Sequence, residues 1–358
     1  MFGLSGRPEL STAHHVPPAQ TSTSSQGQER DPASPDDYLP PRWLRNAHLQ
    51  SILSSSDLRR RRGLRRLQAL GAQSTEHIFD GGAGVRLQGW HTLIPGMEVR
   101  GLALLLHGWE GSAESSYMRM TAASLLEAGY EVVRLNFRDH GDTHHLNEEI
   151  FHSCLLPEVL HAACDVAQRF PQRPMVAAGY SLGGNFVLRL ALRAPQAGLP
   201  LKHVAAVCPV LDPHSALLGM ERGLPLYHWY FQRRWRRSLE RKRALFPERH
   251  LYDDQTLSLS VRELTRWMVE HETDFGTLEN YLDGYSVAGN RLATLAVPAN
   301  ILMAQDDPVI PFADFARWQL PPIARLEVAR WGGHCGFIEN AQCDGFGERW
   351  VTDRLTSC

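Results

Sequence analysis

The clearest indication of the fold is the stretch Met175-Val176-Ala177-Ala178-Gly179-Tyr180-Ser181-Leu182-Gly183-Gly184-Asn185. A short apolar run stops at Gly179-Tyr180-Ser181-Leu182-Gly183, and a helical pattern from Phe186 to Ala194 begins at once. This is the G-x-S-x-G pattern, in which a serine stands on a sharp turn between a strand and a helix. Such a turn strains the serine backbone, and the neighbouring glycines give it room. The sequence therefore predicts that Ser181 is a nucleophile at the N-terminus of a helix, where developing negative charge is favoured.

Candidates for the other two members of a catalytic triad follow this serine in the chain. A serine hydroxyl needs a histidine to remove its proton and a carboxylate to orient that histidine. His334 stands in a Gly-rich loop after the last expected strand, and among 17 histidines it alone has this context. Asp307, directly after an apolar strand, is the expected carboxylate. Asp306 is the second choice, and both could instead only cap a helix from Pro311 to Trp318.

An oxyanion hole is predicted beside the serine. It needs two backbone N–H groups aimed at the developing alkoxide. One is expected from Leu182, directly after the serine. The other is expected from Trp109, because the apolar strand 102–106 ends at His107-Gly108, where glycine allows the chain to turn. The predicted site therefore consists of Ser181, Asp307 and His334 with the N–H groups of Trp109 and Leu182.

The composition is typical of a soluble globular protein with one large domain. Of the 358 residues, 43% are hydrophobic and 21% are charged, and the formal net charge of -2 argues against nucleic acid as an obligate partner. No stretch approaches the roughly twenty apolar residues of a transmembrane helix, and the N-terminus lacks a basic region followed by an apolar one. We therefore expect a cytoplasmic protein with no nucleic-acid partner.

The cysteines and histidines do not form a recognisable metal motif. Six cysteines are scattered without C-x-x-C pairs, which favours free thiols in a reducing compartment over disulfides or a zinc site. The histidines and aspartate between His140 and His145 could bind a metal, but their spacing fits no closed zinc pattern. Cys335 could be a nucleophile, but Ser181 has the better context. We therefore expect no cofactor and no metal.

Strands and helices alternate along most of the chain. We expect a hairpin between Thr75 and Thr92 and a fully buried strand at residues 102–106. The alternation predicts an α/β fold with a mostly parallel central sheet and helices on both faces. Residues 1–36 are rich in Ser, Thr, Pro and Gln, so we expect a disordered tail before a domain of residues 37–358. Further strands are expected at 130–135, 204–209, 300–304 and 326–329.

Two basic segments invite a binding interpretation. The arginines between Arg59 and Arg66 could bind phosphate, but a solvated surface is favoured because no aromatic residues are interleaved with them. Residues 211–285 resemble an inserted helical cap, with Tyr227 to Phe231 followed by the basic run Arg233 to Arg237. We expect the apolar face of the cap to cover the site. Membrane-surface binding by this basic, aromatic helix is the alternative.

The motifs together resemble the α/β-hydrolase superfamily and, more narrowly, the YheT-like family of hydrolases, which is related to the abhydrolase-domain proteins of eukaryotes and to the medium-chain ester synthases of yeast. The resemblance spans residue 38 to the C-terminus and implies an α/β-hydrolase fold whose triad is Ser181, Asp307 and His334. The family usually has Arg-Gly-x-x-Gly where this chain has Arg138-Asp139-His140-Gly141. The motifs are Asn46-Ala47-His48-Leu49-Gln50-Ser51, His107-Gly108-Trp109-Glu110-Gly111-Ser112, Asn136-Phe137-Arg138-Asp139-His140-Gly141-Asp142, Gly179-Tyr180-Ser181-Leu182-Gly183-Gly184-Asn185, Asp306-Asp307-Pro308 and Gly332-Gly333-His334-Cys335-Gly336.

The function expected from the residues and the resemblance is a serine hydrolase of carboxylic esters. Its small-molecule substrate would be a short- to medium-chain acyl ester or a lipid-like ester, because an apolar, aromatic cap suits acyl chains better than sugars or peptides. Acyl transfer from an ester or thioester to an alcohol is the alternative within the same chemistry, and it depends on whether the cap excludes water. A non-catalytic lipid-binding protein on the same fold is the alternative of another class.

Overall fold

The computed structural model describes residues 33–171 and 173–357. Most of the expected tail, residues 1–36, lies outside the described residues. Its last residues are folded onto the domain: Ala33 is buried, and its backbone N–H donates to Oδ2 of Asp353 at 2.8 Å. A short 3-10 helix, η1 (Pro35–Asp37), follows. The folded chain therefore includes residues from Ala33 onward, four residues before the expected boundary.

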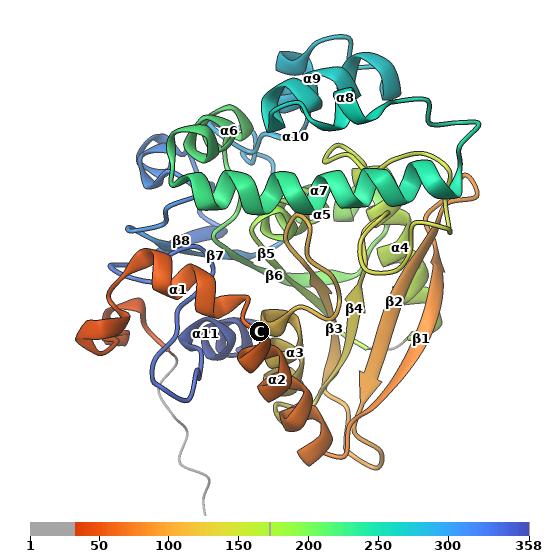
Figure 1. Cartoon of the computed structure of the whole chain (residues 1–358). Coiled ribbons are helices and arrows are strands. Elements are labelled where there is room, and N and C mark those ends of the chain that lie inside the picture. Colours follow the sequence, from red (N-terminus) through yellow and green to blue (C-terminus); the bar gives the residue numbers. More distant parts are fainter. Residues whose placement is uncertain (1–32, 172, 358) are drawn as a thin grey trace, which may run out of the picture. The chain divides into compact units, whose positions relative to one another are not determined.

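An eight-stranded sheet forms the centre of the molecule, in the order β1-β2-β4-β3-β5-β6-β7-β8 (Figure 1). β1 and β2 form the expected antiparallel hairpin, β2 pairs antiparallel with β4, and all later pairs are parallel. Every residue of β3, β4 and β5 is buried, which explains the apolar sequences of β3 and β5. β4 also buries two charged residues, Glu131 and Arg134, each of which forms an ion pair with a residue outside the strand. This sheet confirms the predicted fold class. The strands are β1 (Gln73–Asp80), β2 (Arg86–Leu93), β3 (Gly101–Leu106), β4 (Tyr130–Leu135), β5 (Met175–Tyr180), β6 (Leu201–Val207), β7 (Ala299–Ala304) and β8 (Ala324–Ala329).

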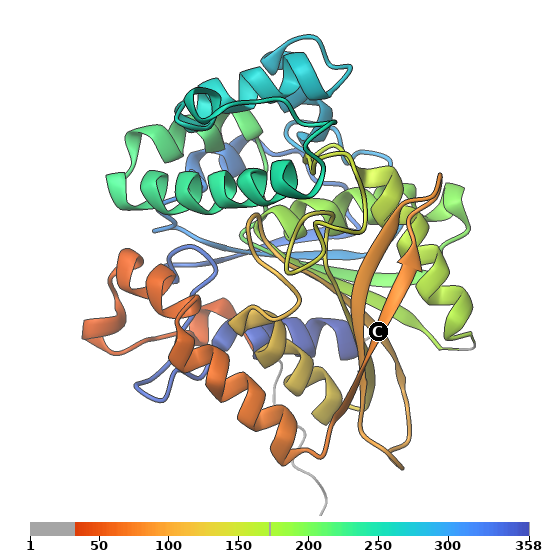
Figure 2. The same cartoon turned by 45° about the vertical axis from the view of Figure 1, so that its right-hand side comes forward.

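Helices cover both faces of the sheet. Figure 2 shows α2, α3 and α11 on one face and α4 and α5 on the other. α5 begins directly after β5, so the predicted strand-turn-helix unit around Ser181 is present. The helices of this layer and the N-terminal segment are η2 (Arg42–Leu44), α1 (Ala47–Ser54), α2 (Asp57–Ala69), α3 (Ser116–Glu127), α4 (Leu156–Arg169), α5 (Leu182–Ala197) and α11 (Phe346–Thr356).

Five helices between β6 and β7 lie where the sequence predicted a cap insertion. They have their own apolar cluster, which includes Trp235, Leu239, Leu264 and Met268. In Figure 1, α7 runs across the molecule between the sheet below it and α8 and α9 above it. None of the helices in the described ranges is long and apolar enough to cross a membrane. The cap helices are α6 (Pro213–Arg222), α7 (Pro225–Leu245), α8 (Asp254–Leu257), α9 (Val261–Glu272) and α10 (Leu278–Tyr285).

The expectation of a solvated basic surface at α2 was wrong for Arg59. Its side chain is 0% exposed and forms an ion pair with Glu348 of α11. Arg59, Gly63 and Leu67 are buried along one face of α2, which faces α3. A side chain at Gly63 would place Cβ 2.8 Å from Cβ of Arg119, so glycine permits the close approach of the two helices. The charge pattern alone could not show that one arginine of the run faces inward.

Candidate active site

Ser181 occupies a strained turn between β5 and α5. Its φ of 54° and ψ of -118° are unusual for a residue with a side chain. A Cβ at Gly179 would lie 2.1 Å from the carbonyl oxygen of Gly183, and a Cβ at Gly183 would lie 2.2 Å from that of Leu106. The glycines are therefore required because the turn folds tightly on itself and against the end of β3.

His334 stands between Ser181 and Asp307. Its Nε2 lies 2.9 Å from Oγ of Ser181, and its Nδ1 lies 2.9 Å from Oδ2 of Asp307. When Nδ1 carries the proton, the imidazole donates to the carboxylate and leaves Nε2 to accept the serine proton. The three side chains that the sequence singled out are thus brought within hydrogen-bond distance, in a chain of contacts suited to activating a serine.

The two candidate carboxylates have different partners. Asp307 is fully buried, and its second oxygen, Oδ1, accepts two backbone N–H groups of the following turn at 2.8 and 2.9 Å. Asp306 instead accepts the N–H of Gly333 at 2.9 Å, in the loop that carries His334. The expected helix is a short 3-10 turn, Phe312–Arg317, and no side chain caps it. The geometry therefore favours Asp307 as the partner of the histidine, while Asp306 shapes the histidine loop.

The pKa of His334 reflects two opposing influences. Burial alone lowers the pKa, but the charge of Asp307, the neighbouring Cys335 and the hydrogen bond that His334 donates to Asp307 outweigh burial and raise the pKa of His334 to about 9. The neutral ring, which is the form able to accept a proton, becomes more abundant as the pH rises toward that value. The imidazole of His334 is therefore held in one position and strongly favours its protonated form.

Helix α1 supports the histidine loop. The hydroxyl of Ser51 accepts the backbone N–H of His334 at 2.8 Å. The fully buried side-chain amide of Gln50 accepts the N–H of Ile338 and donates to its carbonyl oxygen. A Cβ at Gly333 would lie 2.2 Å from the backbone of α1. The only sequence signal for this role was the presence of Gln50 and Ser51 in the first motif of the resemblance.

The loop after β3 runs directly past the nucleophile. A Cβ at Gly108 would lie 3.3 Å from Cβ of Ser181, so this position has little room for a side chain. The N–H of Gly108 donates to the hydroxyl of Tyr117 at 3.0 Å. Trp109 and Leu182 line the same cavity as Ser181. The two residues expected to supply oxyanion N–H groups therefore flank the serine.

Trp109 is held in place by a hydrogen bond of the next residue and by contacts of its own ring. The N–H of Glu110 donates to Nε2 of His140 at 3.1 Å, and burial lowers the pKa of His140 to about 4, so this ring is neutral at pH 7. The Trp109 ring stacks on Phe231 of α7 at 5.4 Å and meets Trp235 edge-on at 5.5 Å, both between ring centroids. The cap thus contacts the predicted oxyanion loop directly.

A cavity of about 740 Å³ leads to Ser181 and His334. Its wall on the cap side is largely apolar, while serines and charged residues from α1, α2 and the start of α3 line another part. Burial raises the pKa of Glu110, which also lines the cavity, to about 7. The cap residues on the apolar wall include Leu217, Met220, Leu226, Phe231, Trp235, Val261, Met268, Tyr281 and Leu282.

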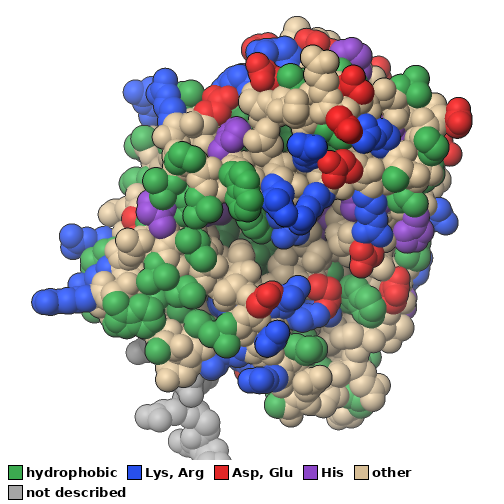
Figure 3. Space-filling view, viewed as in Figure 1, with side chains coloured by type: hydrophobic (Ala, Val, Ile, Leu, Met, Phe, Trp, Pro, Cys, Tyr) green, Lys and Arg blue, Asp and Glu red, His purple; other side chains and the backbone are tan. Residues whose placement is uncertain are grey.

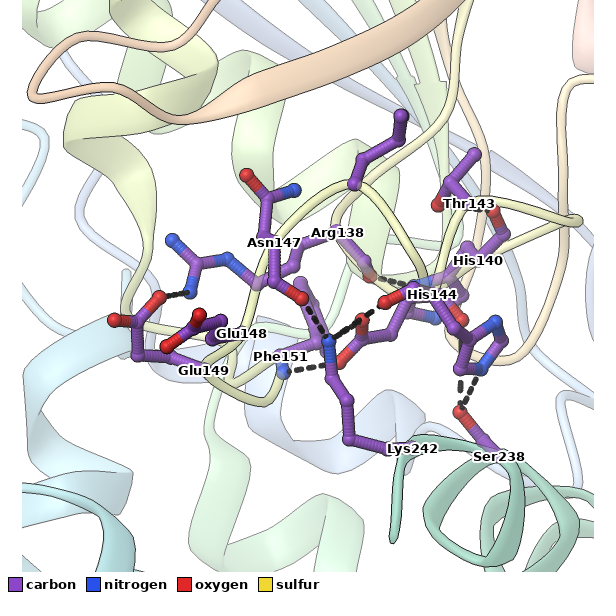
Figure 4. A network of polar contacts seen from close by, with 12 residues as sticks. Arg138, His140, Thr143, His144, Asn147, Glu148, Glu149, Phe151, Ser238 and Lys242 are labelled. Carbon is purple, nitrogen blue, oxygen red and sulfur yellow. Dashed lines mark hydrogen bonds and ion pairs between the residues drawn. The ribbon is translucent and has the colours of Figure 1, made fainter. Parts of the chain in front are cut away.

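The second half of α7 is anchored to the loop that follows β4. Figure 4 shows Lys242 pointing from α7 into this loop. Its Nζ lies 2.7 Å from Oδ1 of Asp139 and donates to the carbonyl oxygens of His144 and Asn147 at 3.0 and 2.5 Å. Asp139 has a φ of 59°, and its other oxygen accepts the N–H of Phe151 at 2.9 Å. A buried lysine therefore holds one loop through an ion pair and two hydrogen bonds.

One cluster of potential metal ligands exists among residues 33–171 and 173–357. It consists of Cys208, His334 and Cys335, whose ligand atoms lie within 4.8 Å of one another. Both ring nitrogens of His334 already face Ser181 and Asp307, so a metal there would disrupt those contacts. Within the segment 140–145, His140 and His144 bond to other partners, the N–H of Glu110 and Ser238. The five described cysteines are free thiols.

A family model described as "alpha/beta hydrolase fold" matches residues 103–341, which contain the strands, the serine turn, the aspartate and the histidine. The chain belongs to the α/β-hydrolase fold family. This α/β hydrolase resembles an esterase from Pyrococcus furiosus with a TM-score of 0.55 and 15% identity, over 81% of this chain and 91% of that one. At such low identity the likeness shows the shared fold alone.

Relatives of this α/β hydrolase include proteins named for ester chemistry. It is 28% identical over 248 residues to mouse phospholipase ABHD3, covering 67% of this chain and 59% of the mouse protein. It is 26% identical over 249 residues to the Escherichia coli protein named "Putative esterase YheT", covering 66% of this chain and 70% of that protein. The chain thus spans less than two thirds of its mouse relative.

Proposed function

We propose that this α/β hydrolase is a serine hydrolase of carboxylic esters. The observation that supports it most is the position of His334, with Nε2 at 2.9 Å from the Ser181 hydroxyl and Nδ1 at 2.9 Å from Asp307. This chemistry is also supported by the strained backbone of Ser181 and by the loop of Trp109, which lines the same cavity. Two relatives of the chain are named as a phospholipase and a putative esterase, which agrees with it.

The proposed reaction proceeds through an acyl-enzyme. His334 takes the Ser181 proton as Oγ attacks the ester carbonyl, and Asp307 keeps the imidazole in the productive tautomer. The backbone N–H groups of Trp109 and Leu182 donate to the oxyanion. His334 then gives its proton to the leaving alcohol, and water, activated by the same histidine, releases the carboxylic acid and restores Ser181.

The cavity supports a proposal for the substrate class. A volume of about 740 Å³ with apolar side chains from the cap suits an acyl chain, and the mouse relative is named a phospholipase. We propose short- to medium-chain acyl or lipid-like esters.

Hydrolysis of p-nitrophenyl esters of increasing acyl length, by the wild type and by Ser181→Ala, tests this function. The wild type should turn over these esters, with a length optimum set by the cavity. Ser181→Ala should lower kcat by about 10⁴-fold or more. Folded wild-type protein that hydrolyses no ester of the series would contradict the proposal and favour a lipid-binding role. Product analysis with added alcohol separates hydrolysis from acyl transfer.

A further inference from the structure

Large apolar side chains stand exposed around the mouth of the cavity. Ile52 of α1, Leu224 before α7, and Leu226, Trp229 and Tyr230 of α7 are between 40% and 55% exposed. Three of these five, Ile52, Leu226 and Tyr230, also line the cavity. We call these five residues the rim patch. Exposed aromatic and aliphatic side chains gathered at a site entrance indicate an interaction surface.

The two helices that carry the rim patch contact each other. Nδ1 of His48 in α1 lies 3.0 Å from the hydroxyl of Tyr227 in α7. Figure 3 shows hydrophobic side chains gathered over this region around a hollow, with basic side chains next to them. The rim patch is therefore one surface that continues into the cavity.

Arginines accompany the rim patch on the first half of α7. Arg233 lies over the ring of Trp229 at 5.4 Å, and Arg234 lies over the ring of Tyr230 at 5.6 Å. Arg222, the last residue of α6, and Arg237, one turn after Arg233 in α7, are also exposed. The helical repeat places Leu226, Trp229, Tyr230, Arg233 and Arg237 on one face.

The acidic residues within α6 and α7 do not neutralise Arg233 or Arg237. Glu221 is paired with Arg262 of α9 at 2.7 Å, and Glu240 is paired with Arg236 at 2.9 Å. The exposed face of this half of α7 is thus both apolar and positively charged. An amphipathic helix with aromatic and aliphatic side chains beside arginines binds in the interface of anionic lipid bilayers.

We propose that the rim patch docks on an anionic lipid surface, with Leu226, Trp229 and Ile52 at the acyl boundary and the arginines on lipid phosphates. In this orientation the cavity mouth opens onto the lipid, so an ester could pass from the bilayer into the cavity. A symmetric contact between two copies through this face would bring their arginines together, and the repulsion disfavours it. The benefit of docking rests on the proposed function, but docking itself requires no catalysis.

Co-sedimentation with vesicles of equal parts phosphatidylcholine and phosphatidylglycerol tests the proposal. The protein should bind these vesicles, should bind pure phosphatidylcholine vesicles less, and should be released by high salt. Trp229→Glu should weaken binding by about tenfold or more, because it places a charge where an apolar ring was buried. Arg233→Glu should weaken binding to the anionic vesicles several-fold. Leu251→Glu is the matched control, because Leu251 is 83% exposed after the far end of α7, and this variant should bind as the wild type does.

Three results would overturn the proposal: a wild type that does not bind the anionic vesicles, a Trp229→Glu variant that binds as well as Leu251→Glu, or sedimentation velocity showing a dimer that Trp229→Glu dissociates. Thermal unfolding of each variant verifies that the fold is intact. Vesicle binding is measured for Ser181→Ala as well as for the wild type. A protein that does not bind vesicles is therefore distinguishable from one that does not hydrolyse esters.

Discussion

The two halves of α7 have opposite surroundings. In the second half, Trp235, Leu239 and Lys242 are buried, and Lys242 is bound to the loop after β4. In the first half, Leu226 and Trp229 are exposed. Because a helix in a protein is stabilised mainly by tertiary packing, anchoring one half allows the other half to present apolar side chains to its surroundings. We infer that the anchored half, together with Phe231, positions the predicted oxyanion loop and that the exposed side chains of the first half make external contacts.

The largest effect should come from breaking the buried ion pair of the anchored half. Lys242→Met leaves Asp139 buried without its partner, and the free energy of unfolding should fall by about 3 to 5 kcal/mol. Burial is the main influence on both pKa values, raising that of Asp139 and lowering that of Lys242, so the pair is costly to desolvate. Replacing both residues, Lys242→Met with Asp139→Asn, should therefore recover much of the lost stability in denaturant unfolding.

Arg241→Met is the control for that pair. Arg241 binds Asp142 at 2.7 Å, but both side chains are exposed, so the free energy of unfolding should change by less than about 0.5 kcal/mol. If Lys242→Met were equally mild, α7 would not be anchored through this lysine.

Substitution of two tryptophans, one in each environment, compares the two halves of α7 directly. Trp235→Ala removes a buried ring that meets Trp109 edge-on, and the free energy of unfolding should fall by about 3 kcal/mol. It should also lower kcat for a soluble ester, because Trp109 loses a neighbour that fixes its loop. Trp229→Ala should change stability by less than about 0.5 kcal/mol, since this ring is 55% exposed. Equal losses in the two variants would remove the distinction between the halves.

Acid should weaken the anchored half. Burial lowers the pKa of His140 to about 4 and that of His144 to about 3. The unfolded chain binds protons on these rings below about pH 6.5, whereas the folded chain does not until the pH is much lower. Stability is therefore fully present above about pH 6.5 and falls as the pH drops toward these folded-state values.

Unfolding curves measured as a function of pH test this dependence. His144→Asn should lose stability less steeply between about pH 6.5 and pH 4 than the wild type does. His145→Asn, at an exposed neighbouring position, serves as the control and should retain the wild-type slope. An unchanged slope in His144→Asn would speak against a buried neutral ring.

The smallest effect is expected on the pH dependence of catalysis, because neither half of α7 carries the proton transfer. The base form of His334 is neutral, and its pKa is raised to about 9, so kcat/KM should rise with pH toward that value. The midpoint should be the same in Trp229→Ala as in the wild type. A midpoint that moved with this substitution would place the cap in the proton transfer itself.

The sequence predicted the sheet and the hairpin, because buried strands read as apolar runs, and it predicted the strand-turn-helix unit at Ser181, because that turn has a fixed local pattern. It ranked Asp307 above Asp306 from its position after β7, and the contacts of His334 agree with that ranking. Such features depend on residues close together in the chain.

Contacts between residues far apart in the chain could not be predicted from the sequence. The burial of Arg59 depends on Glu348 in α11, and the anchoring of Lys242 depends on Asp139 in a loop about a hundred residues earlier. A charged residue is usually expected at the surface, so only the positions of its distant partners reveal that it is buried. Likewise, nothing local marks Ser51 as the support for His334.

Reaction with a fluorophosphonate followed by peptide mass mapping identifies the nucleophile directly. One phosphonyl group should form on Ser181, and it should form much more slowly in His334→Ala. Modification at another residue instead, or folded protein that remains unmodified, would contradict the assignment of Ser181, His334 and Asp307 as an active triad.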